Sequence, residues 1–459
     1  MAQYAESIKE NKMGTMTINK LLISMSLPMI ISMLVQALYN IVDSMFVSQI
    51  GENALTAVSL AFPMQSLMIA VSVGTGVGVN AVLSRSLGQK DYKGANRAAS
   101  NGIFLSVLSF MAFAFIGIFF TNMFLSAQTN DIEILNYGKQ YLYVCTICSF
   151  GLFGQVILER LLQSTGKTFY TMITQGTGAI VNIILDPIFI FGLFGMPKMG
   201  VKGAAIATVI GQIVGMLLAL YFNLKKNHEI KIKLKEFKPH IKTIKRIYAV
   251  GIPSIVMQSI GSVMIFGLNK ILIGFTPTAT AVFGIYFKLQ SFVFMPVFGL
   301  NNGMVPIVSY NYGAKKEDRV IKTIKLSAMY AISIMAIGLF IFQVFPKQLL
   351  YLFNASEDMI RIGVPALKTI SLSFIFAGFC IILSSVFQAL ENGMLSLLIS
   401  VARQLLVILP LAFILGKAFG LNAVWFAFPA AEIVSVTLST LFMKKVYRDT
   451  IKPLSLECN

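Results

Sequence analysis

Twelve long apolar stretches run through this chain, and they constrain its fold more than any other feature. A helix needs about 20 apolar residues to cross the hydrocarbon core of a bilayer, and every stretch reaches that length. The stretches cover residues 20–48, 54–83, 95–121, 135–163, 168–195, 200–224, 244–275, 278–310, 319–346, 359–388, 394–418 and 420–446. The alternating segments of a membrane β-barrel are absent from the sequence. The sequence therefore predicts an all-α polytopic membrane protein with twelve transmembrane helices.

Proline residues inside these stretches remove backbone hydrogen bonds, so we expect the helices to kink there. The prolines concerned are Pro28, Pro253, Pro296 and Pro365.

Charge is scarce in this chain, and its distribution gives the orientation. Only 12% of the 459 residues are charged, whereas a soluble domain carries about 25%. The basic residues concentrate in alternate loops, with nine of them between Lys225 and Arg246. This asymmetry follows the positive-inside rule and predicts that both termini lie in the cytoplasm. The net charge of +18 thus indicates contact with anionic lipid rather than with nucleic acid.

The second half of the chain repeats the first. A shift of 225 residues brings Pro28 onto Pro253 and aligns eight positions around the second span of each half. The aligned pairs are Phe62/Phe287, Gln65/Gln290, Ser66/Ser291, Gly74/Gly299, Gly78/Gly303, Ser84/Ser309, Gly88/Gly313 and Lys90/Lys315. Because each half has six spans, both halves enter the membrane in the same sense. The sequence therefore predicts a parallel repeat of two pseudo-symmetric six-helix lobes, with the substrate path between them.

The repeat divides the chain into five segments. They are a cytoplasmic N-terminal segment (1–19), a first lobe (20–224), a basic cytoplasmic linker (225–243), a second lobe (244–446) and a cytoplasmic C-terminal tail (447–459). We expect the chain to act as a monomer.

Three acidic residues lie inside spans of the first half only. Asp43, Glu159 and Asp186 align with Leu268, Ser384 and Leu409 of the second half. An ionisable side chain within a span costs roughly 2.5–3.5 kcal/mol on insertion, so it usually faces a cavity or a partner. At about 1.5 Å per residue, Asp43 and Asp186 should lie at comparable depth in the outer halves of their spans.

The neighbourhood of these two aspartates suits the binding of a cation. Asn182 shares a helix face with Asp186, because four residues make about one helical turn. Two carboxylates close together in a medium of low dielectric favour the binding of a proton. The alternative is that each carboxylate completes a structural polar network.

Glu159 and Lys288 each allow two interpretations. Glu159 is followed by Arg160 near the cytoplasmic end of its span. It is either an inner acid that meets a cationic substrate or receives the proton, or one partner of an ion pair at the helix end. Lys288 lies about ten residues inside its span, so it either pairs with an acid across the cleft or lines the cavity.

The sequence offers no catalytic site. Both histidines, His228 and His240, lie in the basic linker, which leaves no intramembrane histidine to act as a base or to bind a metal. The run from Gly166 to Thr168 looks like the end of a phosphate-binding loop, but Leu161 stands where that loop needs glycine. We therefore expect a protein that is not an enzyme, has no cofactor and draws on an ion gradient.

These features together resemble the multidrug and toxic compound extrusion (MATE) family. The resemblance covers nearly the whole chain and rests on the two-by-six layout and on three local matches. These are Pro28 with Asp43 in the first span, the segment Asn182 to Pro187, and Gly-Ala-Ala-Ile-Ala-Thr at residues 203–208. The chain is most similar to the branch that holds DinF-like and MepA-type bacterial drug exporters. The NorM-like branch carries an acid in its seventh span, and this sequence has Gly261 at about that position, which argues against a coupling site in the second lobe.

The resemblance implies a site and a function. The implied cation-coupling residues are Asp43, Asn182, Asp186 and Thr208, and Glu159 is implied in substrate handling. We expect export of cationic amphipathic drugs and dyes, driven by antiport of protons or, less favoured, sodium ions, through alternating access.

Adaptable Met, Phe and Tyr side chains suit a cleft that accepts varied aromatic cations. The side chains expected to face the cleft are Gln36, Tyr39, Asn40, Tyr141, Phe153, Met264 and Phe283, and Pro28 is the expected hinge. Two other functions remain open: a flippase for lipid-linked saccharides of the same superfamily, which a cavity Lys288 favours, and a membrane scaffold that transports nothing.

Overall fold

The computed structural model describes residues 11–232 and 237–456, and all regular structure within them is helical. The first half contains α2 (Lys12–Thr15), α3 (Ile18–Ser48), α4 (Glu52–Gly88), α5 (Tyr92–Ser126), α6 (Ile132–Ile147), α7 (Phe150–Ser164), α8 (Thr168–Phe191), the short η1 (Leu193–Gly195) and α9 (Val201–Lys225). The second half contains α10 (Ile241–Ile273), α11 (Pro277–Gly313), α12 (Glu317–Val344), α13 (Pro346–Tyr351), α14 (Glu357–Ser371), α15 (Phe374–Ala389), α16 (Gly393–Val401), the π-helical η2 (Ala402–Ile408), α17 (Leu409–Phe419), α18 (Leu421–Val424), α19 (Ala427–Val446), the π-helical η3 (Tyr447–Ile451) and α20 (Pro453–Leu456).

Parts of the predicted terminal and linker segments lie outside the described residues. They are residues 1–10 of the N-terminal segment, residues 233–236 of the basic linker, and residues 457–459 of the tail.

Twelve membrane spans account for the helices of the described chain. Ten helical stretches are long and apolar enough to cross a bilayer, and two bent helix pairs, α6 with α7 and α14 with α15, bring the number to twelve. Every predicted apolar stretch overlaps one of these spans. The prediction of an all-α fold with twelve transmembrane helices is confirmed.

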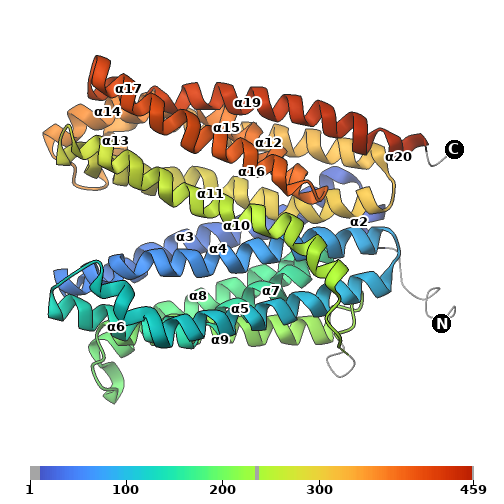
Figure 1. Ribbon diagram of the computed structural model, residues 1–459, viewed down its shortest axis with the longest axis horizontal. Helices are drawn as coiled ribbons and strands as arrows, with labels where there is room; N and C mark the ends of the chain where they lie inside the picture. Colours follow the sequence, from blue (N-terminus) through green and yellow to red (C-terminus); the bar gives the residue numbers. More distant parts are fainter. Residues whose placement is uncertain (1–10, 233–236, 457–459) are drawn as a thin grey trace.

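The spans form two lobes of six, one from each half of the chain (Figure 1). The helices α3 to α9 fill the lower lobe of that view, and α10 to α19 fill the upper lobe. Both α2 and α20 lie at the right-hand end, which we call the terminal end. The even number of spans in each half brings the chain back to this end after six crossings, as a parallel repeat requires.

The two broken spans bend at equivalent places of the repeat. The helix pair in the first half bends by 44° at Cys148 and Ser149, and the pair in the second half bends by 48° at Leu372 and Ser373. The Ser373 hydroxyl donates to the carbonyl of Ile370 at 2.6 Å, and the backbone N–H of Ser373 donates to the same carbonyl at 3.0 Å. These two sharp bends were missed by the sequence analysis.

The predicted proline kinks do not interrupt their helices. Helices α3, α10 and α11 continue through Pro28, Pro253 and Pro296, and α14 continues through Pro365. Proline is tolerated within membrane helices because neighbouring groups take over the freed backbone bonds.

Matching hydrogen bonds appear in both lobes, 225 residues apart. The hydroxyl of Ser84 donates to the carbonyl of Ser164 at 3.0 Å, and that of Ser309 donates to the carbonyl of Ala389 at 2.8 Å. The two-lobe pseudo-symmetry predicted from the sequence is thus visible in individual contacts.

At the terminal end the lobes are held together by a close crossing of α4 and α11. A β-carbon added to Gly88 would lie 1.9 Å from the carbonyl oxygen of Tyr310, and one added to Gly313 would lie 2.2 Å from that of Arg85. Any side chain larger than hydrogen would therefore push the two helices apart. The close approach of the two helices explains why this position of the repeat is glycine in both halves.

The short helix α2 lies between the two lobes at the same end. The Asn11 side chain accepts from the backbone of Met13 and donates to the carbonyl of Thr165 in the first lobe. From the second lobe, Asn311 and Arg319 donate to the carbonyl of Met13 at 3.0 and 2.9 Å. The Met13 side chain is fully buried. The terminal end is therefore closed by contacts that cross between the lobes.

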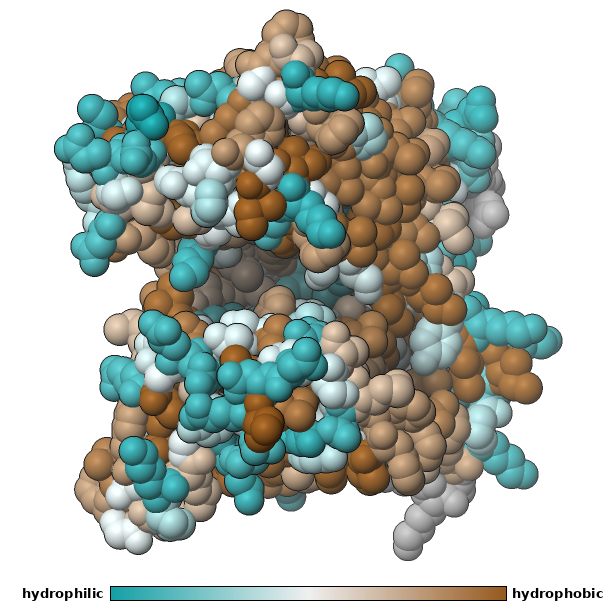
Figure 2. Space-filling model, turned by 60° about the vertical axis from the view of Figure 1, so that its left-hand side comes forward, coloured by the Kyte–Doolittle hydropathy of each residue, from teal (hydrophilic) through white to brown (hydrophobic). Residues whose placement is uncertain are grey.

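The opposite end of the molecule is open. Figure 2 looks onto that end and shows a cleft between the two lobes, with polar residues around its mouth. Closure at one end and opening at the other is the arrangement of a transporter whose central path faces one side of the membrane.

The glycine crossing can be tested by adding one methyl group. We expect Gly88→Ala to lower the free energy of unfolding by about 1–3 kcal/mol, because the methyl group has no space against the Tyr310 carbonyl. Thermal unfolding of the detergent-purified protein measures the effect. The matched control is Gly176→Ala in α8, where no atom lies within 4 Å of the added carbon and where alanine should be neutral or stabilising by about 0.5–1 kcal/mol. Equal stabilities for the two variants would contradict the close crossing.

Candidate functional site

A pair of aspartates from two different spans forms the centre of the site. Asp43 and Asp186 each lie five residues before the end of their helices, α3 and α8. Because both helices run away from the terminal end, the two side chains reach the same depth and their carboxyl groups come within hydrogen-bonding reach of each other. Asp186 is fully buried and Asp43 is half-buried. The sequence-based expectation of equal depth agrees with this geometry.

The oxygens of this pair lack hydrogen-bond donors. Within residues 11–232 and 237–456, both oxygens of Asp186, one oxygen of Asp43 and the amide oxygen of Asn182 have no hydrogen-bond donor. A buried carboxylate left in this way is strongly destabilised unless something neutralises it. Four buried oxygens without donors therefore fit a proton shared between the carboxyls, or a bound hard cation.

Further hydroxyl and amide groups surround the pair. The Asn182 side chain donates to the hydroxyl of Thr208 at 3.2 Å, and the hydroxyl of Tyr39 lies near the same group. Tyr141 lies behind the aspartates with 4% of its surface exposed, and its hydroxyl accepts from Gln65 at 3.1 Å. The residues implied as the coupling set thus lie around one centre, in the half of the first lobe that is remote from the terminal end.

A cavity extends from this centre deeper into the first lobe. Its volume is about 150 Å³. Its lining residues include Ser32, Gln36, Tyr39, Gln155, Glu159, Gln175, Asn182, Thr208 and Gln212. At about 30 Å³ for each water molecule, such a cavity holds a few waters or an ion with its hydration, whereas pockets for drug-sized ligands measure about 300–1,000 Å³. The drug itself must therefore bind elsewhere, or the cavity must widen.

Glu159 lies in the wall of this cavity and is not at a helix-end surface. Only 3% of its surface is exposed. Its carboxylate accepts from Gln155 at 3.0 Å, from Thr174 at 2.8 Å and from Gln175 at 2.7 Å. The neighbouring Arg160 points away, donating to Gln163 and to Asn302 of the second lobe. The interpretation of Glu159 as part of an exposed ion pair at the helix end is therefore wrong.

Of the glutamines that line this cavity, the sequence analysis named Gln36 but missed Gln155, Gln175 and Gln212, although a signal was present. Gln175, Gly178, Asn182 and Asp186 recur at spacings of three or four residues along α8, so they share one helix face. Gly178 also lets α9 approach, because a β-carbon there would lie 3.0 Å from the carbonyl of Gly211. A polar stripe with a glycine inside an apolar helix is typical of a helix that lines a buried cavity.

Three apolar residues expected to face the cleft lie in packed cores. Phe153 is 1% exposed and stacks on Phe113 at 5.6 Å between ring centroids. Phe283 is 1% exposed and packs against Trp425, and Met264 is buried in the same core. Aromatic residues fill helix interfaces and line clefts equally well, so their type alone did not distinguish the two. Gln36 and Asn40 are exposed on α3.

Lys288 is exposed on α11, and its ammonium lies 5.9 Å from the centroid of the Phe353 ring. It is thus held by a cation–π contact. In the second lobe the buried Glu432 of α19 is paired with Arg403 at 3.0 Å. The first lobe therefore carries the buried acids that have no basic partner among the described residues.

The geometry can be compared with known proteins. A family model described as MatE matches residues 28–188 and 253–414, which are the two halves of the repeat. The chain is 30% identical over 425 residues to the multidrug export protein MepA of Staphylococcus haemolyticus (strain JCSC1435), and the match covers 92% of each protein. This relative is named as a transporter, which agrees with the expectation of a protein that is not an enzyme.

Solved structures share the fold over almost the whole chain. One is a multidrug resistance MATE family transporter of the MOP superfamily in an outward-facing conformation, with a TM-score of 0.90, 26% identity, and coverage of 98% of this chain and 99% of that one. Another, with the same values, is a MOP superfamily transporter from Pyrococcus furiosus Vc1 whose reversed binding-pocket polarity suggests a different function. Since the family model matches both halves and the MepA relative aligns along nearly the full length, the chain belongs to the MATE family of multi-pass membrane transporters, in its MepA-like branch.

Proposed function

We propose that this chain exports cationic amphipathic drugs and dyes in exchange for protons entering the cell. The observation that carries the proposal is the Asp43–Asp186 pair, whose buried oxygens lack donors in the described chain. A structural polar network would supply donors to these oxygens, whereas a coupling site must leave the oxygens free to bind an ion. The multidrug export relative supports the choice of substrate class.

Drug and proton are exchanged because both are attracted by the negative charge of the aspartate pair. In the conformation with the open cleft, protons from outside reach Asp43 and Asp186. Protonation neutralises the pair and weakens its attraction for a bound cationic drug, which then leaves through the cleft. A sodium ion held by the same carboxylates with Asn182 and Thr208 would act in the same way. We favour the proton because a hard cation needs several oxygen ligands, and the amide oxygen of Asn182 is a single neutral oxygen without a donor beside the acids.

Glu159 gives the coupling centre an inner partner. The cavity runs from Tyr39 and Asn182 to Glu159, so water within it can connect the aspartate pair to an acid nearer the terminal end. We propose that Glu159 receives either the proton or the positive charge of the drug when the cleft faces inward.

Pro28 is proposed as the hinge of this cycle. It lies on α3 between the terminal end and Asp43, and proline removes one backbone hydrogen bond from the helix. A change in charge at Asp43 can therefore be converted into a bend of α3 below it.

The orientation follows from the charged ends of the spans. Basic residues gather where α4 ends and α5 begins, at the terminal end, with Arg85, Lys90, Lys93 and Arg97. We propose that this end is cytoplasmic, that the cleft faces outward, and that a monomer in the bacterial plasma membrane is the working unit.

A second candidate function is the flipping of lipid-linked saccharides. Its specific support is Lys288, an exposed cation on α11 that could meet a phosphate group, together with the altered pocket polarity of the Pyrococcus relative. The two candidates separate experimentally: proteoliposomes that move a lipid-linked saccharide but never a cationic dye would favour the flippase.

The aspartate pair can be tested by removing charge without changing shape. We expect Asp43→Asn and Asp186→Asn each to insert and fold, because a neutral side chain enters the bilayer more easily, yet to reduce ethidium efflux at least about tenfold. Efflux from whole cells and elution of the purified protein as a single species are the two measurements. Glu133→Gln, at an exposed carboxylate near the start of α6, is the matched control. Full efflux by either Asn variant would remove that residue from the mechanism.

The coupling ion can be identified by linkage. A drug and a proton that compete for one site must weaken each other's binding, by roughly 5- to 150-fold for couplings of ordinary size. We therefore expect dye affinity of the purified protein to rise as the pH increases from about 5.5 to about 8.5, and Asp43→Asn to flatten that dependence. The measurement is dye fluorescence with and without sodium. Affinity that is flat with pH but lowered by sodium would assign the coupling to sodium.

A further inference from the structure

One turn at the terminal end breaks the symmetry between the lobes. Gly166, between α7 and α8, and Glu391, between α15 and α16, are 225 residues apart and both have left-handed backbone, with φ of 84° and 62°. Glycine adopts this conformation freely, whereas a residue with a β-carbon is disfavoured there. The equivalent left-handed turns at Lys90 and Lys315 carry the same residue in both halves. Glu391 therefore occupies an unfavourable backbone position at which the other half has glycine.

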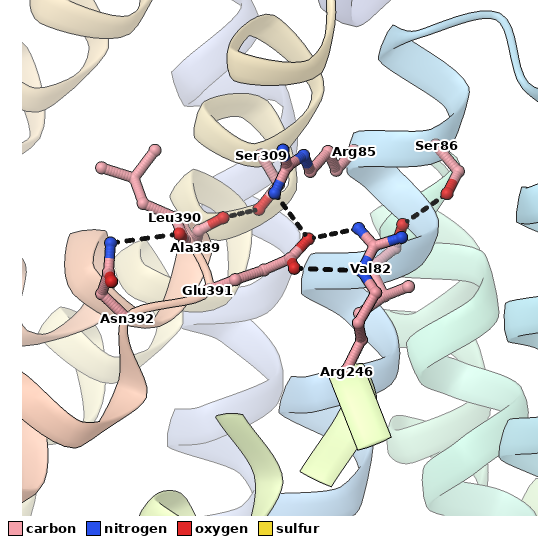
Figure 3. Close-up of polar contacts among 9 residues, drawn as sticks. All are labelled: Val82, Arg85, Ser86, Arg246, Ser309, Ala389, Leu390, Glu391 and Asn392. Carbon is pink, nitrogen blue, oxygen red and sulfur yellow. Dashed lines mark hydrogen bonds and ion pairs between the residues drawn. The ribbon is translucent and has the colours of Figure 1, made fainter. Parts of the chain in front are cut away.

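The Glu391 side chain lies between two arginines (Figure 3). Its carboxylate accepts from two nitrogens of Arg246, at 2.7 and 3.2 Å, which is a two-point contact of the kind that fixes both partners. The same carboxylate pairs with Arg85 at 3.2 Å. Glu391 and Arg246 belong to the second half of the chain, and Arg85 lies near the end of α4 in the first half. The ion pair with Arg85 thus crosses from one lobe to the other.

The groups that form this crossing are held in place from both sides. The Arg85 guanidinium lies 4.6 Å from the centroid of the Tyr312 ring, on α11 of the second lobe. The carbonyl of Ala389 accepts from Ser309, and that of Leu390 accepts from Asn392, so the turn that carries Glu391 is fixed to its own lobe (Figure 3). The side chain of Glu391 is 14% exposed and that of Arg85 is 26% exposed. The cluster is thus partly reached by solvent, so salt can screen its charges and weaken their attraction.

The matching position in the first lobe is filled differently. A β-carbon on Gly166 would lie 3.1 Å from the side chain of Lys12, so glycine leaves room there for α2. Helix α2 joins the lobes through backbone carbonyls, as its bonds from Asn311 and Arg319 indicate. One side of the pseudo-symmetric interface therefore carries a bridging helix, and the other carries an ion-pair cluster beside the α4–α11 crossing.

We propose that the Arg85–Glu391–Arg246 cluster is a releasable latch that holds the terminal end closed and sets the balance between the outward-open and inward-open states. Opening the terminal end separates α4 from the second lobe and breaks the Arg85 contact. Arg246 remains beside Glu391 in its own lobe and acts as a positioning residue. The proposal rests on alternating access as part of the proposed function, but it concerns the closed end and not the coupling site.

The latch is tested by measuring the separation of the lobes without any substrate. Spin labels are attached through Lys93→Cys and Lys322→Cys, two exposed positions at the terminal end of different lobes, after replacement of the four native cysteines. Distances are recorded by electron paramagnetic resonance in lipid nanodiscs. We expect Glu391→Gln and Arg85→Gln each to raise the population with the longer distance roughly two- to tenfold. Salt from about 0.1 to about 1 M should raise it in the parent protein but not in these variants.

Two further variants test whether Glu391 holds the lobes together or only shapes the turn that carries it. Glu391→Gly relieves the strain of the left-handed backbone and removes the carboxylate. If the cluster is a latch, this variant should populate the longer spin-label distance even if its thermal stability rises. Arg361→Gln, which breaks an exposed ion pair with Asp358 inside α14, should leave the distance unchanged.

Unaltered distances in Glu391→Gln and Arg85→Gln, or a more stable but still closed Glu391→Gly, would overturn the proposal. Because the readout needs no drug, a shifted distance in a chain that transports no dye would support the latch while counting against the proposed function.

Discussion

A carboxylate inside a membrane protein must be neutralised by a proton, a cation, a basic partner or donated hydrogen bonds, and the organisation of the first lobe depends on how each acid meets this requirement. Glu159 meets it with three neutral donors, from Gln155, Thr174 and Gln175. Asp186 has no such donors among the described residues. The two acids therefore differ in how much of their charge the surrounding protein compensates.

In the second lobe a basic side chain neutralises the buried acid. Glu432 is buried but is paired with Arg403 at 3.0 Å, so a basic partner from its own lobe compensates its charge. Two lobes that share one backbone plan therefore have opposite electrostatic characters. One carries buried carboxylate oxygens without donors among the described residues, and the other pairs its buried carboxylate with an arginine.

Much of the fold was predictable because lipid imposes a simple rule. Every backbone polar group within the hydrocarbon must be paired inside its own segment, so apolar length alone locates the helices. The aspartate pair was predictable for a related reason: an ionisable residue in a span is too costly to be accidental, and the repeat exposed Asp43 and Asp186 as unmatched in the other half. Both arguments use features of single positions along the chain.

The remaining features depend on packing between helices. Phe153 and Phe283 are as apolar as cleft-lining residues, so only the structure distinguishes a core contact from an open wall. The bends at Ser149 and Ser373 lack the proline that would have marked them. The cavity around Glu159 needs Gln155 from α7 and Gln175 from α8 at once, and no one-dimensional pattern reports that two side chains from different helices converge.

The crossing at Gly88 and Gly313 has an evolutionary consequence. The contact that closes this end is made by backbone carbonyls against glycine α-carbons, and those atoms are unchanged by substitutions elsewhere in the chain. Side chains in the cleft are thus free to diversify without altering how the lobes fit at the closed end. A lineage under pressure from a new toxic compound can change the chemistry of its cleft one residue at a time while it retains a working mechanism of closure.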